Sequence, residues 1–284
     1  MSPLTPAEIQ QAVRAALAED IGSGDATTLA TVPESAQAAG LLCARESLVL
    51  AGVEFAVAAF HELDATVGVE RLAPDGQQLA AGETVLRLSG SARALLTAER
   101  VALNFVQHLS GIATLTARFV AELQGTGARL LDTRKTTPGW RRFEKYAVAC
   151  GGGVNHRFGL FDQILIKDNH LVALRDARPN SIAVAVQRAR AAFPQLKVEV
   201  EADTLEQVRQ AADAGADFIL LDNMDAPRLR EAVRIIAGRA RTEASGGVTL
   251  ETVRALAGTG VDFISVGALT HSARAVDLGL DFEL

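Results

Sequence analysis

The sequence has 284 residues, of which 49% are hydrophobic and 22% are charged, and its formal net charge is −6. The apolar fraction is large enough for a folded core, which excludes general disorder, and the length fits one large domain or two modest ones. An acidic chain without a basic cluster or tail is a poor candidate for binding nucleic acid, so we expect no such partner.

Lysine is scarce, because only four of the 28 Lys and Arg residues are Lys, and none of them precedes Lys135. If the protein binds anions, its positive charge must be concentrated in one place. Cys43 and Cys150 are too few and too widely spaced for a disulfide framework or a zinc motif. The N-terminus lacks the features of a signal peptide, and charges interrupt the most apolar stretch, 41–60. We therefore expect a soluble cytoplasmic protein without a membrane partner.

The first part of the chain predicts an α+β domain. Thr5 is the expected N-cap of the first helix, and a glycine-broken loop is expected over 20–28. From Ser91 a helical pattern continues for about thirty residues, and we expect Gly111 to break it into two helices. We place a domain boundary there, which gives an N-terminal domain of residues 1–110. The other expected elements are helices at 6–19 and 55–63 and strands at 39–44, 67–72 and 84–89.

From residue 128 onward, short apolar strands alternate with helical stretches. This alternation implies a parallel sheet with right-handed crossovers, either a (β/α) barrel or an open doubly wound sheet. Because no Gly-x-Gly-x-x-Gly motif follows a strand, we favour the barrel, which would occupy residues 111–272. The expected strands are 128–132, 163–166, 197–201, 218–222, 241–244 and 262–266, and the expected helices are 182–192, 204–214, 227–237 and 250–258.

Basic side chains gather where function is expected in a barrel, on the loops after the carboxyl ends of the strands. Two of the four lysines, Lys135 and Lys167, fall at such positions. Arg presents a planar fork that suits carboxylates, whereas Lys is a point charge that suits phosphates, so the set indicates an anionic substrate with both groups. The candidate residues at the strand ends are Thr133, Arg134, Lys135, Lys167, Glu201, Asp222, Ser245, Gly246, Gly247, Ser265, Val266 and Gly267, with His156 and Arg157 shortly before the second strand.

Glycine turns and an acidic pair accompany these basic residues. The turns 245–247 and 265–267 each precede an expected helix start, where backbone N–H groups of barrels hold phosphates. Glu201 and Asp222 either balance the lysines in structural ion pairs or hold sugar hydroxyls or Mg²⁺. Among the histidines only His156 lies in the basic cluster; His61, His108 and His271 are expected at surface or packing positions, and His170 stays undecided.

Residues 132–160, which read DTRKTTPGWRRFEKYAVACGGGVNHRFGL, closely resemble the signature of the quinolinate phosphoribosyltransferase family. Trp140 and Phe143 depart from the aliphatic residues expected there, but they flank the site and leave its charged set intact. Further similar segments are 19–27, 97–104, 165–170, 198–201, 220–223, 243–247 and 265–271, so the resemblance spans essentially the whole chain.

The resemblance implies a fold and an assembly. The fold is α/β, an incomplete (β/α) barrel of about six to seven parallel strands, with an N-terminal α+β domain of residues 1–110 that residues 273–284 rejoin. The implied assembly is a homodimer, or a hexamer built from such dimers. In it the N-terminal domain of one subunit closes the barrel of its neighbour, so that the active site is shared.

The resemblance also implies an activity, that of a glycosyltransferase of the pentosyl class. Quinolinate and phosphoribosyl pyrophosphate (PRPP) would react to nicotinate mononucleotide, pyrophosphate and CO₂, with Mg²⁺ as cofactor, in de novo NAD biosynthesis. The quinolinate carboxylates would be bound by Arg134, His156, Arg157 and Lys167, together with Arg100 of the partner subunit.

The remaining implied roles concern the phosphorylated substrate. Lys135, Glu201 and Asp222 would be catalytic: Lys135 would stabilise the departing pyrophosphate, and the two carboxylates would hold the ribose hydroxyls or Mg²⁺. The turns 245–247 and 265–267 would bind the 5′-phosphate.

Two alternatives remain open from the sequence. The first is a Schiff-base aldolase on the same barrel, in which Lys167 would be the reactive amine with a lowered pKa. The second is a non-catalytic paralogue that binds a phosphorylated ligand. The complete set of charged residues argues against the second alternative, and the many neighbouring cations make an anion clamp the simpler interpretation of Lys167.

Overall fold

The computed structural model describes residues 3–283, which divide into two compact units. Unit 1 contains the residues up to 117, residues 142–152 and the segment from 272 onward; unit 2 contains residues 118–141 and 153–271. These units differ from the predicted division into 1–110 and 111–272, because residues 142–152 pack within unit 1. Phe143, for example, lies edge-on to Phe55 with 5.0 Å between the ring centroids.

Unit 1 is built on a four-stranded antiparallel sheet with the strand order β12-β1-β5-β3. The last strand of the chain pairs with the first, in a register that sets Gly40 opposite Phe282. The residues near the C-terminus therefore complete the N-terminal sheet. Its strands are β1 (Gln37–Ala44), β3 (Gly68–Arg71), β5 (Thr84–Ser91) and β12 (Leu278–Phe282), and a separate pair is formed by β2 (Leu48–Val49) and β4 (Gln78–Leu79).

The helices of unit 1 are α1 (Pro6–Ile21), α2 (Ala26–Thr31), α3 (Val53–Leu63), most of α4 (Ala92–Glu122) and α5 (Arg141–Cys150). Thr5 caps α1 in a capping box with Glu8, as the sequence predicts. Helix α2 lies partly in the segment predicted to be a loop. Its six residues carry no apolar stripe, and only its cap identifies it: the Asp25 carboxylate accepts a hydrogen bond from the Thr28 N–H at 3.0 Å.

The predicted break at Gly111 is wrong, because α4 runs without interruption through its 31 residues. A glycine is present there for another reason. A Cβ atom at position 111 would lie only 2.0 Å from the backbone carbonyl oxygen of Arg274. The helix therefore needs glycine where the C-terminal segment passes against it, and it accepts the lower helix propensity of this residue.

Unit 2 contains a six-stranded sheet in which every pair of neighbours is parallel, with the order β6-β11-β10-β9-β8-β7. β11, the last of these strands along the chain, pairs with β6, the first, so the sheet curls back on itself. Val154 forms a parallel bridge to Leu131 on β6, and within residues 3–283 no ladder joins β6 to β7. The barrel is incomplete, as predicted. Its strands are β6 (Arg129–Leu131), β7 (Ile164–Ile166), β8 (Val198–Ala202), β9 (Phe218–Asp222), β10 (Arg241–Ser245) and β11 (Phe263–Ser265).

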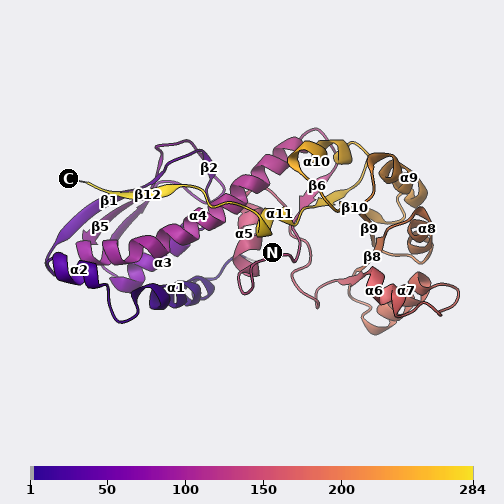
Figure 1. Ribbon diagram of the computed structural model, residues 1–284, viewed down its shortest axis with the longest axis horizontal. Helices are drawn as coiled ribbons and strands as arrows, with labels where there is room; N and C mark the ends of the chain where they lie inside the picture. The colour runs from indigo at the N-terminus through magenta and orange to yellow at the C-terminus, as the bar shows by residue number, and fades with distance from the viewer. Residues whose placement is uncertain (1–2, 284) are drawn as a thin grey trace. The chain divides into compact units, whose positions relative to one another are not determined.

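Helices α8, α9 and α10 lie on the outer side of the strands that they connect (Figure 1). Side-chain caps begin α7, α8 and α9: Asn180, Thr204 and Asp225 each accept a hydrogen bond from a backbone N–H of the first turn. Across residues 3–283, no helix combines the length and the apolar character needed to cross a membrane. The helices of unit 2 are α6 (Asp168–Val172), α7 (Ser181–Ala192), α8 (Leu205–Asp213), α9 (Ala226–Ile236), α10 (Leu250–Ala257) and α11 (Ala268–His271).

The close approach at Gly111 gives a testable prediction. Gly111→Ala should lower the free energy of unfolding by about 1–3 kcal/mol, because its Cβ atom would displace the backbone at Arg274. Gly127→Ala is the matched control, since a Cβ atom at position 127 would have no neighbour within 4 Å. Urea denaturation of both variants measures the difference. Equal stability of the two variants would contradict the proposed contact.

Candidate active site

Unit 2 has a cavity of about 330 Å³ at the carboxyl ends of its strands. Ten of the residues singled out from the sequence line it. Leu165, Leu220 and Glu243 also line it and were not predicted. The full lining is Thr133, Arg134, Lys135, His156, Arg157, Leu165, Lys167, Glu201, Leu220, Asp222, Glu243, Ser245 and Ser265.

The other predicted site residues lie elsewhere. Gly246 and Gly247 follow β10, and Val266 and Gly267 follow β11, so all four are adjacent in sequence to lining residues. Val266 is buried, with 2% of its surface exposed. Arg100 lies on α4 within unit 1, where its side chain is exposed.

Two arginines supply the buried positive charge of the cavity. The Arg157 guanidinium donates from Nη1 to the backbone carbonyl of Gln163 at 3.0 Å, and burial together with the charge of Arg134 lowers its pKa. The Nε of Arg134 is buried and has no hydrogen-bond partner among residues 3–283. A buried donor without an acceptor is costly, so the arrangement suits an anion that would supply the acceptor.

Asp132, which directly follows β6, holds the segment 155–157 against the end of this strand. This carboxylate is fully buried. Its Oδ1 accepts a hydrogen bond from the backbone N–H of His156 at 2.7 Å, and its Oδ2 accepts one from Asn155 Nδ2 at 2.8 Å. Two segments that are separated in the sequence, 133–135 and 155–157, therefore face the same cavity.

Next to Arg157 lies a buried cluster of one histidine and two glutamates. The Nε2 of His156 is 3.1 Å from Glu199 Oε2 and 3.4 Å from Glu243 Oε2. Burial by itself lowers the pKa of His156, but the hydrogen bonds to the two carboxylates outweigh it and raise this pKa to about 10. Burial and the neighbouring Glu243 carboxylate raise the pKa of Glu199 to about 7. The cluster thus places two carboxylates within a cationic cavity.

The sequence contains a pattern that places these two glutamates on the same strand faces as predicted site residues, although they do not lie at the strand ends. Side chains alternate along a strand, so residues two apart share a face. Glu199 precedes the site candidate Glu201 by two residues, and Glu243 stands in the same relation to Ser245. Residue pairs at this spacing face the barrel interior together.

The acidic pair lies on neighbouring strands. Glu201 Oε2 is 3.2 Å from Lys167 Nζ, so the structural ion pair considered from the sequence forms for one lysine. Asp222 Oδ2 accepts a hydrogen bond from Asn223 Nδ2 at 2.7 Å. Burial and the nearby charge of Asp203 raise the pKa of Asp222, although Lys167 and Lys135 oppose the rise.

Glycine is required in the turn after β10, and side chains also come close to the glycine after β11. Gly246 has a φ of 97°, and a Cβ atom there would lie 2.1 Å from Asn223 Oδ1. A Cβ atom at Gly267 would lie 2.9 Å from Lys135 Cδ and 3.2 Å from His271 Nε2. The prediction that His271 lies at the surface is confirmed, because this residue is exposed, and its ring lies beside Gly267.

The undecided His170 has a local structural contact. Its Nδ1 accepts a hydrogen bond from the backbone N–H of Lys167 at 3.0 Å, within the turn that begins α6. This contact accounts for the histidine without a catalytic role.

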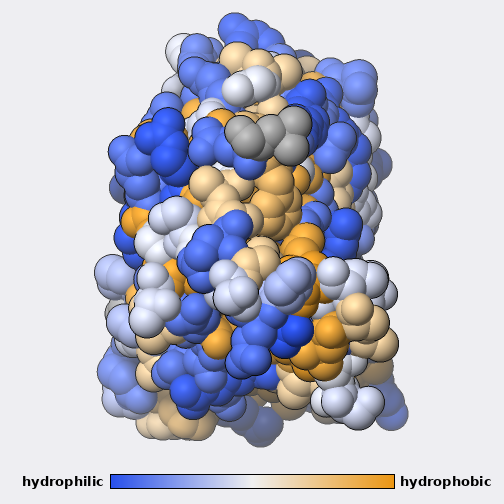
Figure 2. Space-filling model, turned by 90° about the vertical axis from the view of Figure 1, so that its left-hand side faces the viewer, coloured by the Kyte–Doolittle hydropathy of each residue, from blue (hydrophilic) through white to orange (hydrophobic). Residues whose placement is uncertain are grey.

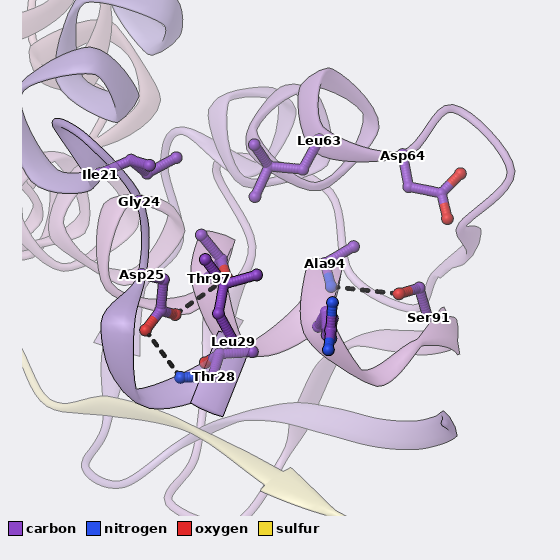
Figure 3. Close-up of a pocket in the computed structure, with 11 residues that line it drawn as sticks. Ile21, Gly24, Asp25, Thr28, Leu29, Leu63, Asp64, Ser91, Ala94 and Thr97 are labelled. Carbon is purple, nitrogen blue, oxygen red and sulfur yellow. Dashed lines mark hydrogen bonds between the residues drawn. The ribbon is translucent and has the colours of Figure 1, made fainter. Parts of the chain in front are cut away.

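Unit 1 has a cavity of its own, of about 370 Å³, between the start of α4, the end of α3 and the connection from α1 to α2 (Figure 3). Its lining combines apolar side chains with the charged residues Asp25, Asp64 and Arg93. The Asp25 carboxylate accepts hydrogen bonds from Thr28 N–H and from the Thr97 hydroxyl at 2.9 Å (Figure 3). These bonds lower the pKa of Asp25 and tie α2 to α4.

Comparisons with known proteins agree along the whole chain. The family model described as quinolinate phosphoribosyl transferase, N-terminal domain, matches residues 25–110, and the corresponding C-terminal domain model matches residues 112–281. A nicotinate-nucleotide pyrophosphorylase [carboxylating] of Mycobacterium leprae is 46% identical over 275 residues, which cover 95% of each chain. A protein of Bacillus subtilis with the same name, qualified as probable, is 45% identical and aligns over 94% of this chain and 90% of its own length.

Solved structures show the same similarity. NadC from Streptococcus pyogenes superposes with a TM-score of 0.94 at 44% identity and covers 100% of both chains. The nicotinate-nucleotide pyrophosphorylase from Francisella tularensis gives a TM-score of 0.93 at 40% identity, with 99% of this chain and 98% of the other covered.

The anchoring role of Asp132 gives a prediction. Asp132→Asn should lower the free energy of unfolding by about 1–3 kcal/mol, because an amide cannot accept both hydrogen bonds that the buried carboxylate accepts. Hydrogen exchange at the backbone of 155–157 should also become faster. Asp213→Asn, at an exposed ion pair with Arg239, is the control and should change the stability by less than about 0.5 kcal/mol. Unchanged exchange at 155–157 would rule out the anchor.

Proposed function

The chain belongs to the quinolinate phosphoribosyltransferase family, and we propose that it joins quinolinate to PRPP, forming nicotinate mononucleotide, pyrophosphate and CO₂. The protein is then a pentosyltransferase of NAD biosynthesis, in keeping with the names of its relatives. One observation carries the proposal from the geometry: the cavity combines several cations with the buried Arg134 Nε, which has no acceptor among the described residues. Such a site suits a substrate with several anionic groups.

The basic residues of the cavity can bind the two adjacent carboxylates of quinolinate. Arg134 and Arg157 offer planar forks, Lys167 adds a further donor, and His156 adds positive charge beside them. A pyridine ring held by both carboxylates has its nitrogen fixed in one direction. If that direction is toward C1 of the ribose, the enzyme replaces a bimolecular encounter with an oriented one.

The anionic leaving group needs positive charge that is already in place. Lys135 lies at the carboxyl end of β6 and lines the cavity, where its ammonium can stabilise the departing pyrophosphate. Glu201 and Asp222 provide carboxylate oxygens, which are the ligands that Mg²⁺ prefers, and Asp203 adds charge nearby. We therefore assign Mg²⁺ or the ribose hydroxyls to this acidic pair. When bound, the ion would offset negative charge on the pyrophosphate.

The turns after β10 and β11 suit the 5′-phosphate. Residues 245–247 and 265–267 present backbone N–H groups at strand ends, and Gly246 and Gly247 have positive φ angles of 97° and 59°. Without Cβ atoms the backbone can approach a phosphate closely. This assignment leaves the arginines free for the carboxylates.

Loss of CO₂ follows from the chemistry of the ribosylated ring. Once its nitrogen bears the ribose, the ring is cationic, and it can stabilise the electron pair left at C2 when the C2–carboxylate bond breaks. A proton then adds at C2. We propose that water supplies it and that the protein contributes no strong general acid.

The aldolase alternative is not supported by the surroundings of Lys167. A Schiff-base lysine needs a desolvated amine with a lowered pKa. The side chain of Lys167 is 48% exposed, and its ammonium is paired with Glu201. Lys167 therefore lacks the desolvated surroundings that a Schiff-base amine needs.

We also propose a homodimer, or a hexamer of such dimers, in which Arg100 of the partner subunit completes the quinolinate site. In support, Arg100 is exposed on α4, and the nearby apolar residues Leu29 and Leu96 are 57% and 37% exposed. Figure 2 shows hydrophobic residues grouped among hydrophilic ones on one face of the molecule. Cys43 and Cys150 are free thiols, which suits the reducing cytoplasm where we expect the enzyme to work.

The first test is an assay for nicotinate mononucleotide and CO₂ from quinolinate and PRPP. The wild-type protein should form both in equal amounts. Lys135→Ala and Arg134→Ala should each reduce kcat/KM by about 100-fold or more, because each removes charge that binds or stabilises an anion. Lys197→Ala, at an exposed ion pair with Asp217, is the control and should behave as wild type. Near-normal rates in both site variants would refute the assigned site.

The second test mixes two inactive variants. Arg100→Ala and Arg134→Ala, unfolded and refolded together, should recover about a quarter of the wild-type activity, because half of the dimers are mixed and each contains one intact site. Each variant refolded alone is the control. Verified mixed dimers without activity would count against a shared site.

A further inference from the structure

The cluster of His156, Glu199 and Glu243 contains more charge than substrate binding alone explains. Both glutamate side chains are essentially fully buried inside the barrel. Taking a carboxylate out of water costs several kcal/mol unless a close partner compensates for it. Each of them also leaves its Oε1 without a hydrogen-bond partner among the residues described. Burying two such carboxylates lowers the stability of the core, which indicates that they have a role in the site.

The geometry identifies their common partner. Glu199 comes from β8 and Glu243 from β10, and both direct Oε2 at the same atom, Nε2 of His156. Glu199 is itself held by Gln163, whose Nε2 donates to Oε2 at 2.8 Å. The backbone N–H of His156 is fixed independently by Asp132. The ring is therefore held from two strands and from its own backbone, which leaves it little freedom to turn.

We propose that Glu199 and Glu243 are positioning residues for quinolinate binding: they hold the His156 ring in place and offset the mutual repulsion of the cations around it. The inference rests on the proposed function, because it takes His156 to be part of the quinolinate site. The other ring nitrogen of His156, Nδ1, accepts a hydrogen bond from the backbone N–H of Arg157 at 2.7 Å, so the ring that the carboxylates hold in turn fixes Arg157 at the cavity. Here two carboxylates act on one ring.

Electrostatics supports this role over a metal site. The three side chains each offer one ligand atom, and these atoms lie within 4.8 Å of one another, a spacing that also suits a divalent cation. Arg134 and Arg157 belong to the same cavity, and the charge of Arg134 already lowers the pKa of Arg157. A further divalent cation would add to this repulsion, whereas two carboxylates reduce it.

Glu243→Gln tests the proposal, because it keeps the shape of the side chain and removes its charge. The quinolinate KM should rise about 10-fold or more, while the KM for PRPP should stay within about twofold, since only one substrate depends on the ring. Glu206→Gln on the surface of α8, where the carboxylate pairs with Arg209, is the matched control and should change neither constant. A purely structural role would alter both constants together, and that result would overturn the proposal.

A double-mutant cycle shows whether Glu243 affects quinolinate binding through His156 or independently of it. If Glu243 acts through His156, the variant with both Glu243→Gln and His156→Gln should bind quinolinate no more weakly than His156→Gln alone. Multiplying losses would contradict the proposal. Stoichiometric divalent metal in the wild-type protein that is absent from Glu243→Gln would also contradict it and would favour a metal site.

Two controls keep the outcome decisive. Should Glu243→Gln fail to fold, Glu199→Gln carries the same prediction, and failure of both to fold would assign the pair to core stability and overturn the proposal. Wild-type turnover is measured in the same assay. Its absence would contradict the proposed function, whereas normal wild-type turnover with an unchanged quinolinate KM in the variants would contradict only the positioning role.

Discussion

Parallel pairing of the strands in unit 2 is the constraint on which the site depends. Because β6 to β11 all run in the same direction, their carboxyl ends open on one cavity, and residues from far apart in the chain line it together. Lys135, Glu201 and Ser265 come from three different strand ends. The same pairing sends backbone hydrogen bonds to neighbouring strands, which leaves the side chains at the ends available for chemistry.

Buried carboxylates are the second feature of this barrel that bears on the site. Asp132, Glu199 and Glu243 are all essentially inaccessible to water, and all three contact the segment that carries His156. A fold selected for stability alone would have little use for them, since apolar residues of similar volume cost less to bury. Their place beside a cavity lined by basic residues is the basis for the positioning role that we propose for the two glutamates. Gly246 is a comparable case, because it gives up local stability for the close approach of Asn223.

Much of the architecture could be predicted from the sequence, because periodicity and caps are local. The strands β8 to β11 and the helices α7 to α10 fall within one or two residues of their predicted bounds. The failures have physical causes. Helix α2 is too short to show a helical period of apolar residues, so only its N-cap, Asp25, indicates it in the sequence. Gly111 was interpreted as a helix break, although the residue that requires glycine there, Arg274, lies far away in the sequence.

The sequence by itself determined the alternation of strands and helices, the family, and the basic residues at the strand ends. Each of these can be recognised from residues that are close together in the sequence. Only the tertiary structure decided which side chains meet. It brought Glu199 and Glu243 onto one nitrogen of His156, left Arg134 Nε without a partner among the residues described, and placed His271 beside Gly267. Contacts of this kind depend on how the strands curve and pair, and no local pattern of residues records that geometry.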